Sequence, residues 1–137
     1  MGEHYYSQTP TSAHQRQQFT IAHGGRTLQF ESDAGVFSKG HLDKGSALLL
    51  KALPEAFEGR ALDLGCGWGP IGACMAVQWP TAQIVMTDIN DRAVALSREN
   101  LARNGLKAEV VQGDGLRVGA NGLGGLVGVD DVVLLHN

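Results

Sequence analysis

Short apolar runs alternate with helical patterns over the second half of this sequence. Four runs favour β-strands: 61–64, 84–87, 109–111 and 132–135. Apolar residues at helical spacing cover 70–78 and 90–104. Pro70 suits a first helical turn, and Gly105 suits the position just past a helix end. Strands that alternate with helices predict an α/β fold with an open, mainly parallel sheet flanked by helices.

The N-terminal part of the sequence predicts a β-hairpin followed by one helix. The β-favouring residues 19–21 and 27–30 lie on either side of a Gly-Gly dipeptide at 24–25, which is typical of a tight turn. The next helical pattern extends from 42 to 53, where Pro54 closes it. We therefore expect two antiparallel strands and a helix ahead of the parallel sheet.

Length and composition fit one domain. The chain has 137 residues, of which 43% are hydrophobic and 18% are charged, so a single packed core is expected. We expect residues 1–16 to form an exposed arm and residues 17–137 to form the domain. The sequence has no apolar run of about 18 residues that would predict a membrane span. Its polar start lacks the apolar stretch of a secretory signal, which predicts a cytoplasmic protein.

The charges and the cysteines limit the kinds of ligand that the chain is expected to bind. The formal net charge is −3, and residues 61–137 account for it, with five basic against eight acidic residues. This balance has the wrong sign for binding nucleic acid by bulk electrostatics, so an RNA substrate would need a local surface. Cys66 and Cys74 are eight residues apart, which matches no zinc or redox spacing. We therefore expect reduced thiols and no metal site.

A glycine-rich loop, residues 65–69, joins the first strand of the sheet to the following helix. Glycine lets the backbone approach a ligand closely, and a helix N-terminus offers free N–H groups. The run Gly67-x-Gly69-x-x-Gly72 also fits the dinucleotide fingerprint of dehydrogenases. Asp88 ends the next strand 88 − 67 = 21 residues later, where an acid that binds ribose hydroxyls is expected. The pattern therefore predicts an adenosine-containing cofactor.

Three features distinguish between cofactors of this kind. Asp63 lies within the first strand, where a buried carboxylate is costly unless it meets a partner, such as a cofactor ammonium group. Asp114 follows the third strand between two glycines, where its carboxylate could accept a hydrogen bond from an adenine amino group. The chain is also too short for the substrate domain that a dehydrogenase usually carries. S-adenosylmethionine fits these features better than NAD, whose pyrophosphate the Asp63 carboxylate would repel.

Two segments resemble one protein family. Residues 62–72, Leu-Asp-Leu-Gly-Cys-Gly-Trp-Gly-Pro-Ile-Gly, resemble the first motif of class I S-adenosylmethionine-dependent methyltransferases. Residues 35–46, Gly-Val-Phe-Ser-Lys-Gly-His-Leu-Asp-Lys-Gly-Ser, are similar to a segment of the small-methyltransferase-domain family, which includes ribosomal RNA methyltransferases. The resemblance covers residues 4–137. It implies a Rossmann-like sheet preceded by a β-hairpin.

The resemblance also implies a set of cofactor-binding residues. They are Phe37, Ser38, Asp43, Asp63, Gly65, Cys66, Gly67, Gly69, Asp88, Ile89 and Asp114. In this assignment Asp88 binds the ribose hydroxyls, Ile89 packs on the adenine and Asp114 faces the adenine amino group. The loop residues and Asp63 line the methionine and ribose part of S-adenosylmethionine, and the residues at 37, 38 and 43 border its methyl group and amino-acid end.

The resemblance further implies one catalytic residue and a shortened domain. In the family the fourth strand leads into Asn-Pro-Pro-aromatic, and its Asn accepts a hydrogen bond from the exocyclic amine to be methylated. Asn137 matches this residue, and the prolines, the aromatic and the later strands of a seven-stranded sheet have no counterpart here. We therefore expect an N-terminal piece of a methyltransferase. Its strand at 132–135 would be an unpaired edge that favours self-association.

The function implied by the resemblance is N-methylation of a guanine exocyclic amine in ribosomal RNA, with S-adenosylmethionine as the methyl donor. Two alternatives stay open. One is a non-catalytic cofactor-binding or dimerising module, because the substrate motif is cut off. The other is a fragment of a nucleotide-binding oxidoreductase. If the chain binds S-adenosylmethionine, the carboxylates of Asp63 and Asp88 must face one shared site.

Overall fold

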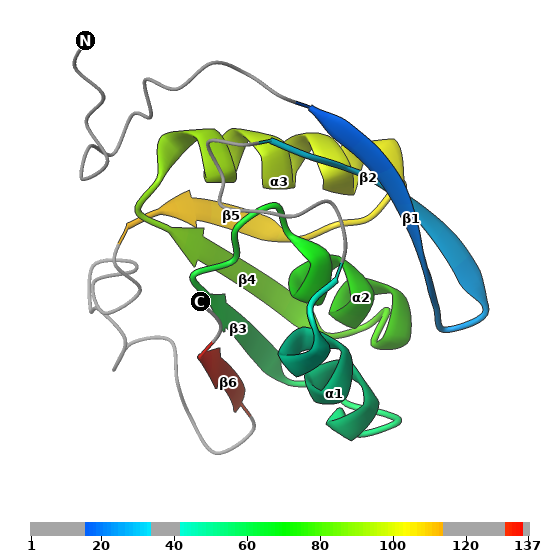
Figure 1. The fold of residues 1–137 in the computed structure, drawn as a ribbon. Helices are drawn as coiled ribbons and strands as arrows, with labels where there is room; N and C mark the ends of the chain where they lie inside the picture. The colour runs from blue at the N-terminus through cyan, green and yellow to red at the C-terminus, as the bar shows by residue number, and fades with distance from the viewer. Residues whose placement is uncertain (1–15, 34–41, 114–130, 136–137) are drawn as a thin grey trace, which may run out of the picture.

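The structure, a computed structural model, describes residues 16–33, 42–113 and 131–135 of the chain (Figure 1). Its strands and helices follow in this order: β1 (Gln17–His23), β2 (Arg26–Ser32), α1 (Lys44–Ala52), β3 (Arg60–Leu64), α2 (Pro70–Gln78), β4 (Gln83–Asp88), α3 (Asp91–Arg103), β5 (Glu109–Gln112) and β6 (Asp131–Leu135). Every strand and helix that the apolar pattern predicts is present, and the boundaries agree with the predicted ones to within two residues.

Strands β3 to β6 form one parallel sheet in the order β5-β4-β3-β6. The chain adds β4 and β5 on one side of β3 and then returns with β6 to the other side of β3. In open α/β sheets, ligands bind outside the carboxyl ends of the strands at such a reversal of strand order. The glycine-rich loop, which follows β3, therefore leaves the sheet where a ligand is expected. The predicted Rossmann-like α/β architecture is confirmed.

Helices α2 and α3 pack on the same face of the sheet. Both crossovers, β3–α2–β4 and β4–α3–β5, advance in the same direction, and right-handed crossovers in one direction place their helices on one side. The two helices and alternate residues of the strands share one buried core, which includes Ala61, Ile71, Met75, Ile84, Met86, Leu96, Leu101 and Val110. This core fixes the start of α2 against the end of β4, where the predicted site lies.

The predicted hairpin is confirmed and packs against both helices. Phe19 of β1 lies opposite Phe30 of β2 in an antiparallel pair. Gly24 and Gly25 turn the chain with φ values of +59° and +78°, a backbone region that favours glycine. Leu28 and Phe30 are fully buried in the same core as α2 and α3. In Figure 1 the hairpin lies beside α3 and α2, with β2 in contact with α3 and β1 in contact with α2.

Helix α1 begins at Lys44, two residues later than predicted, because Asp43 is its N-cap. The Asp43 carboxylate accepts a hydrogen bond from the Ser46 backbone N–H at 2.8 Å and one from the Ser46 hydroxyl at 3.3 Å. After the helix, the Pro54 carbonyl accepts a hydrogen bond from the Trp79 indole at 2.8 Å. This contact ties the end of α1 to the end of α2.

Strand β6 lies at one edge of the described sheet, as predicted for residues 132–135. Among the described strands, β3 is the one that pairs with it, with Leu64 beside Leu135. Self-association through this edge stays a prediction. In the described ranges, no helix has the length and apolar character needed to cross a membrane.

Candidate functional site

The glycine-rich loop has a backbone conformation that depends on its glycines. Gly65, Gly67 and Gly69 have φ values of +74°, +59° and +93°, all in the left-handed region. The N–H groups of Gly65 and Cys66 both donate to the Thr87 carbonyl at 2.8 Å, which joins the loop to the carboxyl end of β4. The loop is therefore held between β3 and β4. A Cβ built on Gly67 would meet nothing within 4 Å, so the loop is open on that side.

Asp88, the last residue of β4, contacts this loop directly. One oxygen of its carboxylate accepts a hydrogen bond from the Gly67 backbone N–H at 2.9 Å, and the other accepts one from the Asn90 N–H at 3.0 Å. Each carboxylate oxygen has a further lone pair, so the group can accept additional hydrogen bonds from a ligand. The structure thus places Asp88 where the sequence predicts a ribose-binding acid, at the end of the strand and beside the loop.

Asp63 lies on β3 beneath the loop and is completely buried. Its Oδ2 accepts a hydrogen bond from the backbone N–H of Gly72 at 3.1 Å, in the first turn of α2. The N-cap residue Gly69 offers no side chain to this turn, so Asp63 supplies a carboxylate to the helix N-terminus. Burial raises the pKa of Asp63 to about 7; the Gly72 hydrogen bond opposes this shift, and the charge of Asp88 adds to it.

The two carboxylates lie close enough to influence one another and bind opposite ends of the same loop-to-helix segment. Asp88 accepts from Gly67, and Asp63 accepts from Gly72. The cofactor hypothesis requires both carboxylates to face one shared ligand site, and this stays a prediction, because the completely buried Asp63 lies beneath the loop. Both carboxylates also have a structural role, since each one satisfies a backbone N–H that a glycine-rich turn would otherwise leave without an acceptor.

Cys66 contributes its backbone to the loop, while its side chain packs in the core. The residue is fully buried, and its Sγ lies 3.5 Å from the Ser97 hydroxyl. Burial and the charge of Asp63 raise the pKa of the Cys66 thiol far above its usual range, so the thiol stays protonated. A ligand at this loop would therefore meet the Cys66 peptide group and not a thiolate.

Some of the other predicted site residues lie within the described ranges of the chain, and some lie outside them. Ile89 follows Asp88 and is 53% exposed, as a residue available to a flat apolar ligand must be. Asp43 caps α1 through Ser46, which gives its carboxylate a local structural role. Four predicted residues lie outside the described ranges: Phe37, Ser38, Asp114 and Asn137.

The side chain of Trp68 belongs to the core. The sequence leaves open whether this loop residue shields a ligand or closes the core. Its ring is buried and contacts Phe19 and Phe30 edge-on, with centroid distances of 4.6 Å and 5.3 Å. The indole thus anchors the loop to the hairpin.

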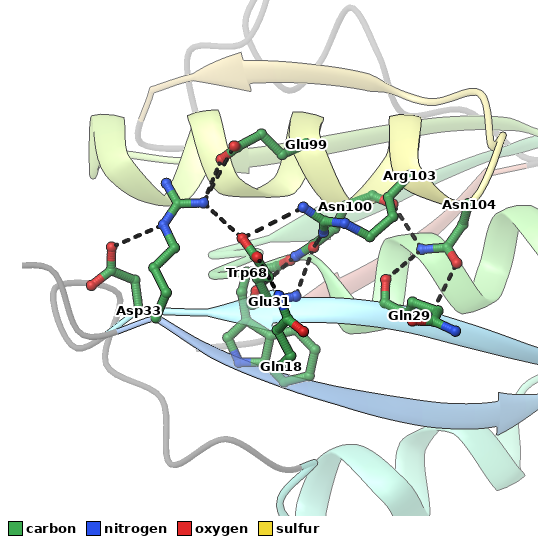
Figure 2. A network of polar contacts seen from close by, with 10 residues as sticks. Gln18, Gln29, Glu31, Asp33, Trp68, Glu99, Asn100, Arg103 and Asn104 are labelled. Atoms are coloured by element: carbon green, nitrogen blue, oxygen red, sulfur yellow. Dashed lines mark hydrogen bonds and ion pairs between the residues drawn. The ribbon is translucent and has the colours of Figure 1, made fainter.

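Two polar residues of α3 hold the loop and were missed by sequence reasoning. Ser97 donates a hydrogen bond from its hydroxyl to the Gly67 carbonyl at 2.8 Å. Asn100 donates from its side-chain amide to the Trp68 carbonyl at 2.7 Å, a contact drawn in Figure 2. Both residues are fully buried among the apolar positions of α3. Polar residues at such positions are the signal that could have identified them, because a buried polar side chain requires hydrogen-bond partners.

The chemistry of this site suits a ligand with positive charge and hydroxyl groups. Asp88 offers a carboxylate beside an open glycine loop, and the buried Asp63 carboxyl group lies beneath that loop at the start of α2. Within the described ranges, no cluster of three or more histidine, cysteine or acidic residues could hold a metal ion.

The sheet order and the glycine loop together define a Rossmann-like α/β domain with a nucleotide-type loop after β3. The particular family is shown by comparison with known proteins. The family model for the methyltransferase small domain matches residues 27–122, which is most of the chain. The chain belongs to this family.

Relatives in bacteria agree with this assignment. The chain is 42% identical over 116 residues to the uncharacterized protein YbxB of Bacillus subtilis (strain 168), an alignment that covers 83% of this chain and 58% of the relative. It is 47% identical over 98 residues to ribosomal RNA small subunit methyltransferase C of Stutzerimonas stutzeri (strain A1501), covering 72% of this chain and 30% of that protein. The alignments therefore span between 30% and 58% of the length of these relatives.

Solved structures show the same fold. A T. thermophilus 16S rRNA guanine N2 methyltransferase (RsmC), in complex with AdoMet and guanosine, superposes with a TM-score of 0.62 at 27% identity, over 81% of this chain and 36% of that one. A precorrin 8w decarboxylase of Methanobacterium thermoautotrophicum gives a TM-score of 0.61 at 22% identity, over 76% of this chain and 54% of that one. The second match shows the fold alone.

Proposed function

We propose that this chain binds S-adenosylmethionine at the loop of residues 65–69. The observation that carries the proposal is the Asp88 carboxylate, which lies at the end of β4 and is held by the Gly67 N–H at 2.9 Å. A carboxylate in this position can accept hydrogen bonds from ribose hydroxyls. The T. thermophilus relative, whose fold this chain shares, was solved with AdoMet, which supports the choice of cofactor.

The residues at the loop fit this cofactor better than a dinucleotide. S-adenosylmethionine carries a sulfonium and an ammonium group, and the buried Asp63 carboxylate favours positive charge nearby. A pyrophosphate would instead lie beside the Asp88 carboxylate, whose negative charge would repel it. The open space beside Gly67 allows a ligand to approach the backbone.

We further propose that the protein methylates the exocyclic amine of a guanine in ribosomal RNA. The bound cofactor supplies an activated methyl group, and the protein supplies position and orientation. Asn137 would accept a hydrogen bond from the amine and align its lone pair with the methyl group. Support comes from the methyltransferase C relatives, which are ribosomal RNA enzymes by name, and from the guanosine bound in the T. thermophilus structure.

Isothermal titration calorimetry of the chain with three ligands tests the cofactor proposal. We expect one S-adenosylmethionine and one S-adenosylhomocysteine to bind per chain, and NAD to give no binding heat. Binding of NAD without binding of the other two would replace the methyltransferase proposal with the oxidoreductase alternative.

A separate assay tests the substrate. Small ribosomal subunits and protein-free 16S ribosomal RNA are incubated with the chain and methyl-labelled cofactor, and the RNA is digested to nucleosides. We expect label in N2-methylguanosine. Cofactor binding with no transfer to either RNA would favour the non-catalytic module.

A further inference from the structure

A polar contact network connects the hairpin, helix α3 and the glycine loop (Figure 2). Asn100 lies at its centre. Its Oδ1 accepts a hydrogen bond from the Glu31 N–H at 2.9 Å, and its Nδ2 donates to the Glu31 carbonyl at 3.0 Å. The amide of this side chain therefore pairs with the peptide of β2 by two hydrogen bonds, as a neighbouring strand would.

Asn104 repeats this pairing one helical turn further along α3. Its Oδ1 accepts from the Gln29 N–H, and its Nδ2 donates to the Gln29 carbonyl, both at 2.8 Å. Four residues of helix advance by about 6 Å, and two residues of strand advance by about 6.6 Å. These two spacings match closely, so α3 lies along the edge of β2. It takes the place that a third strand of the hairpin sheet would have.

Asn100 differs from Asn104 in a second set of contacts. Its Nδ2 donates its second hydrogen to the Trp68 carbonyl at 2.7 Å, and its Oδ1 also accepts a hydrogen bond from Arg103. An Asn side chain has two donor hydrogens and two acceptor lone pairs, and all four are used here. The described contacts of Asn104 include no residue of the glycine loop.

Ser97 and Asn100 together hold two consecutive carbonyls of the loop against α3. The Gly67 carbonyl accepts from Ser97, and the Trp68 carbonyl accepts from Asn100. The peptides of the described chain are trans, so a carbonyl that points toward α3 turns the next N–H away from it. The Trp68 N–H is thereby directed away from the helix.

We propose that Asn100, with Ser97, is a positioning residue for the cofactor-binding loop. The two side chains fix the orientation of the peptides between Gly67 and Gly69, and Asn100 makes that orientation depend on the docking of the hairpin. The inference rests on the proposed binding of S-adenosylmethionine at this loop. Neither residue is assigned a contact with the cofactor.

A matched pair of isosteric variants tests the role of Asn100. Asn100→Asp keeps both acceptor bonds of the side chain and loses its two donor bonds, to Glu31 and to Trp68. Asn104→Asp makes the same chemical change and loses donor bonds to Gln29 and to the Asn100 carbonyl. Dissociation constants for S-adenosylmethionine are measured by calorimetry at 10 °C, and the free energy of unfolding is measured by urea titration of each variant.

We expect Asn100→Asp to raise the dissociation constant by at least about tenfold, because misplaced binding groups are costly. Asn104→Asp should leave it within about twofold, even where both variants lose similar stability. Ser97→Ala, which does not touch the hairpin, should also weaken binding. If Asn100→Asp does not fold, Asn100→Ala takes its place, since it buries no charge.

Equal dissociation constants for wild type, Ser97→Ala and the folded Asn100 variant would overturn the positioning role. So would an equal weakening by Asn104→Asp, because a loss of stability alone would then explain the change. A wild-type chain that binds no S-adenosylmethionine would instead refute the proposed function. In that case amide chemical shifts of Gly67, Trp68 and Gly69 still report on the loop: they must change in Asn100→Asp and stay unchanged in Asn104→Asp.

Discussion

Asp88 combines a structural and a proposed binding role in one side chain. Its carboxylate already accepts two backbone N–H groups, from Gly67 and Asn90. These bonds fix the direction of the carboxylate before any ligand arrives. A group oriented in advance loses less entropy on binding than a mobile one.

Replacing Asp88 by alanine should therefore weaken S-adenosylmethionine binding by roughly 1.5–3 kcal/mol, because charged hydrogen bonds to the ribose are lost. Calorimetry at constant ionic strength measures the change. Glu109→Ala is the matched control, since Glu109 is an exposed carboxylate at the start of β5 and the amino end of the sheet. Unchanged affinity in Asp88→Ala would remove this carboxylate from the proposed site.

Asp63 should make the stability of the fold depend on pH. Burial raises its pKa from the ordinary 3.8 to about 7, so between these values the folded chain binds a proton that the unfolded chain has released. Stability then falls as pH rises, by the linkage of proton binding to folding. Ionisation of Asp63 lowers the free energy of unfolding by its full amount above about pH 7 and has no effect on it below about pH 4.

Asp63→Asn should abolish this part of the pH dependence, because the amide oxygen can still accept from the Gly72 N–H and carries no charge. Urea titrations of both chains at several pH values from 4 to 8 measure the free energy of unfolding. The difference between variant and wild type should grow in favour of the variant as pH rises toward 7. A constant difference over this range would show that Asp63 is ionised throughout.

At the scale of the elements, the close approach of α2 to β4 depends on one glycine. A Cβ on Gly72 would lie 2.7 Å from Met86 Cε and would overlap the rest of that side chain. Gly72→Ala should therefore destabilise the chain by about 1–3 kcal/mol through overpacking. Gly113→Ala, at a glycine with nothing within 4 Å of the added Cβ, should have a much smaller effect in the same thermal or urea unfolding experiment.

The hairpin is held to the helices by apolar burial more than by its ion pairs. Phe30 is 1% exposed and contacts Trp68, so Phe30→Ala should cost about 3–5 kcal/mol. Arg16 pairs with Glu31 at 2.8 Å, with Glu99 at 3.2 Å and with the buried Asp33 at 3.6 Å, and its own side chain is 37% exposed. Arg16→Ala should cost less than Phe30→Ala, since the ion pairs of a partly exposed arginine contribute little. Unfolding midpoints in urea compare the two variants, and the reverse order would contradict this account.

At the scale of the whole molecule, cofactor binding should stabilise the entire described fold. The loop follows β3 directly and contacts β4 and α3 by hydrogen bonds and the hairpin through Trp68, so the site exists only when these elements are assembled. A ligand that binds only the folded chain stabilises it by about 2.7 kcal/mol at a concentration 100 times its dissociation constant.

Differential scanning fluorimetry with increasing S-adenosylmethionine should therefore show a rising melting temperature. The same titration on Asp88→Ala should require a higher ligand concentration for an equal rise. NAD serves as the negative control. A melting temperature that does not respond to S-adenosylmethionine, in a chain that unfolds cooperatively, would contradict binding at this loop.

Local patterns were enough to predict the elements and the residue types at the loop. Strand β3, the glycines after it and the acid at the end of β4 are each encoded in a few neighbouring residues. Glycine is required at 65, 67 and 69 because the backbone there has positive φ, and this requirement is visible in the sequence itself. The apolar periods of strands and helices are equally local.

The tertiary structure decided how those residues are held. Ser97 and Asn100 are 30 and 32 residues from the loop carbonyls they bind, and Asn100 is 69 residues from its partner Glu31. No spacing rule connects positions so far apart, because the contacts form only when α3 packs between the hairpin and the sheet. The sequence by itself therefore determined the elements, the loop and its acids. Which side chains orient that loop depended on long-range packing, since hydrogen-bond partners of buried groups are chosen by the assembled fold.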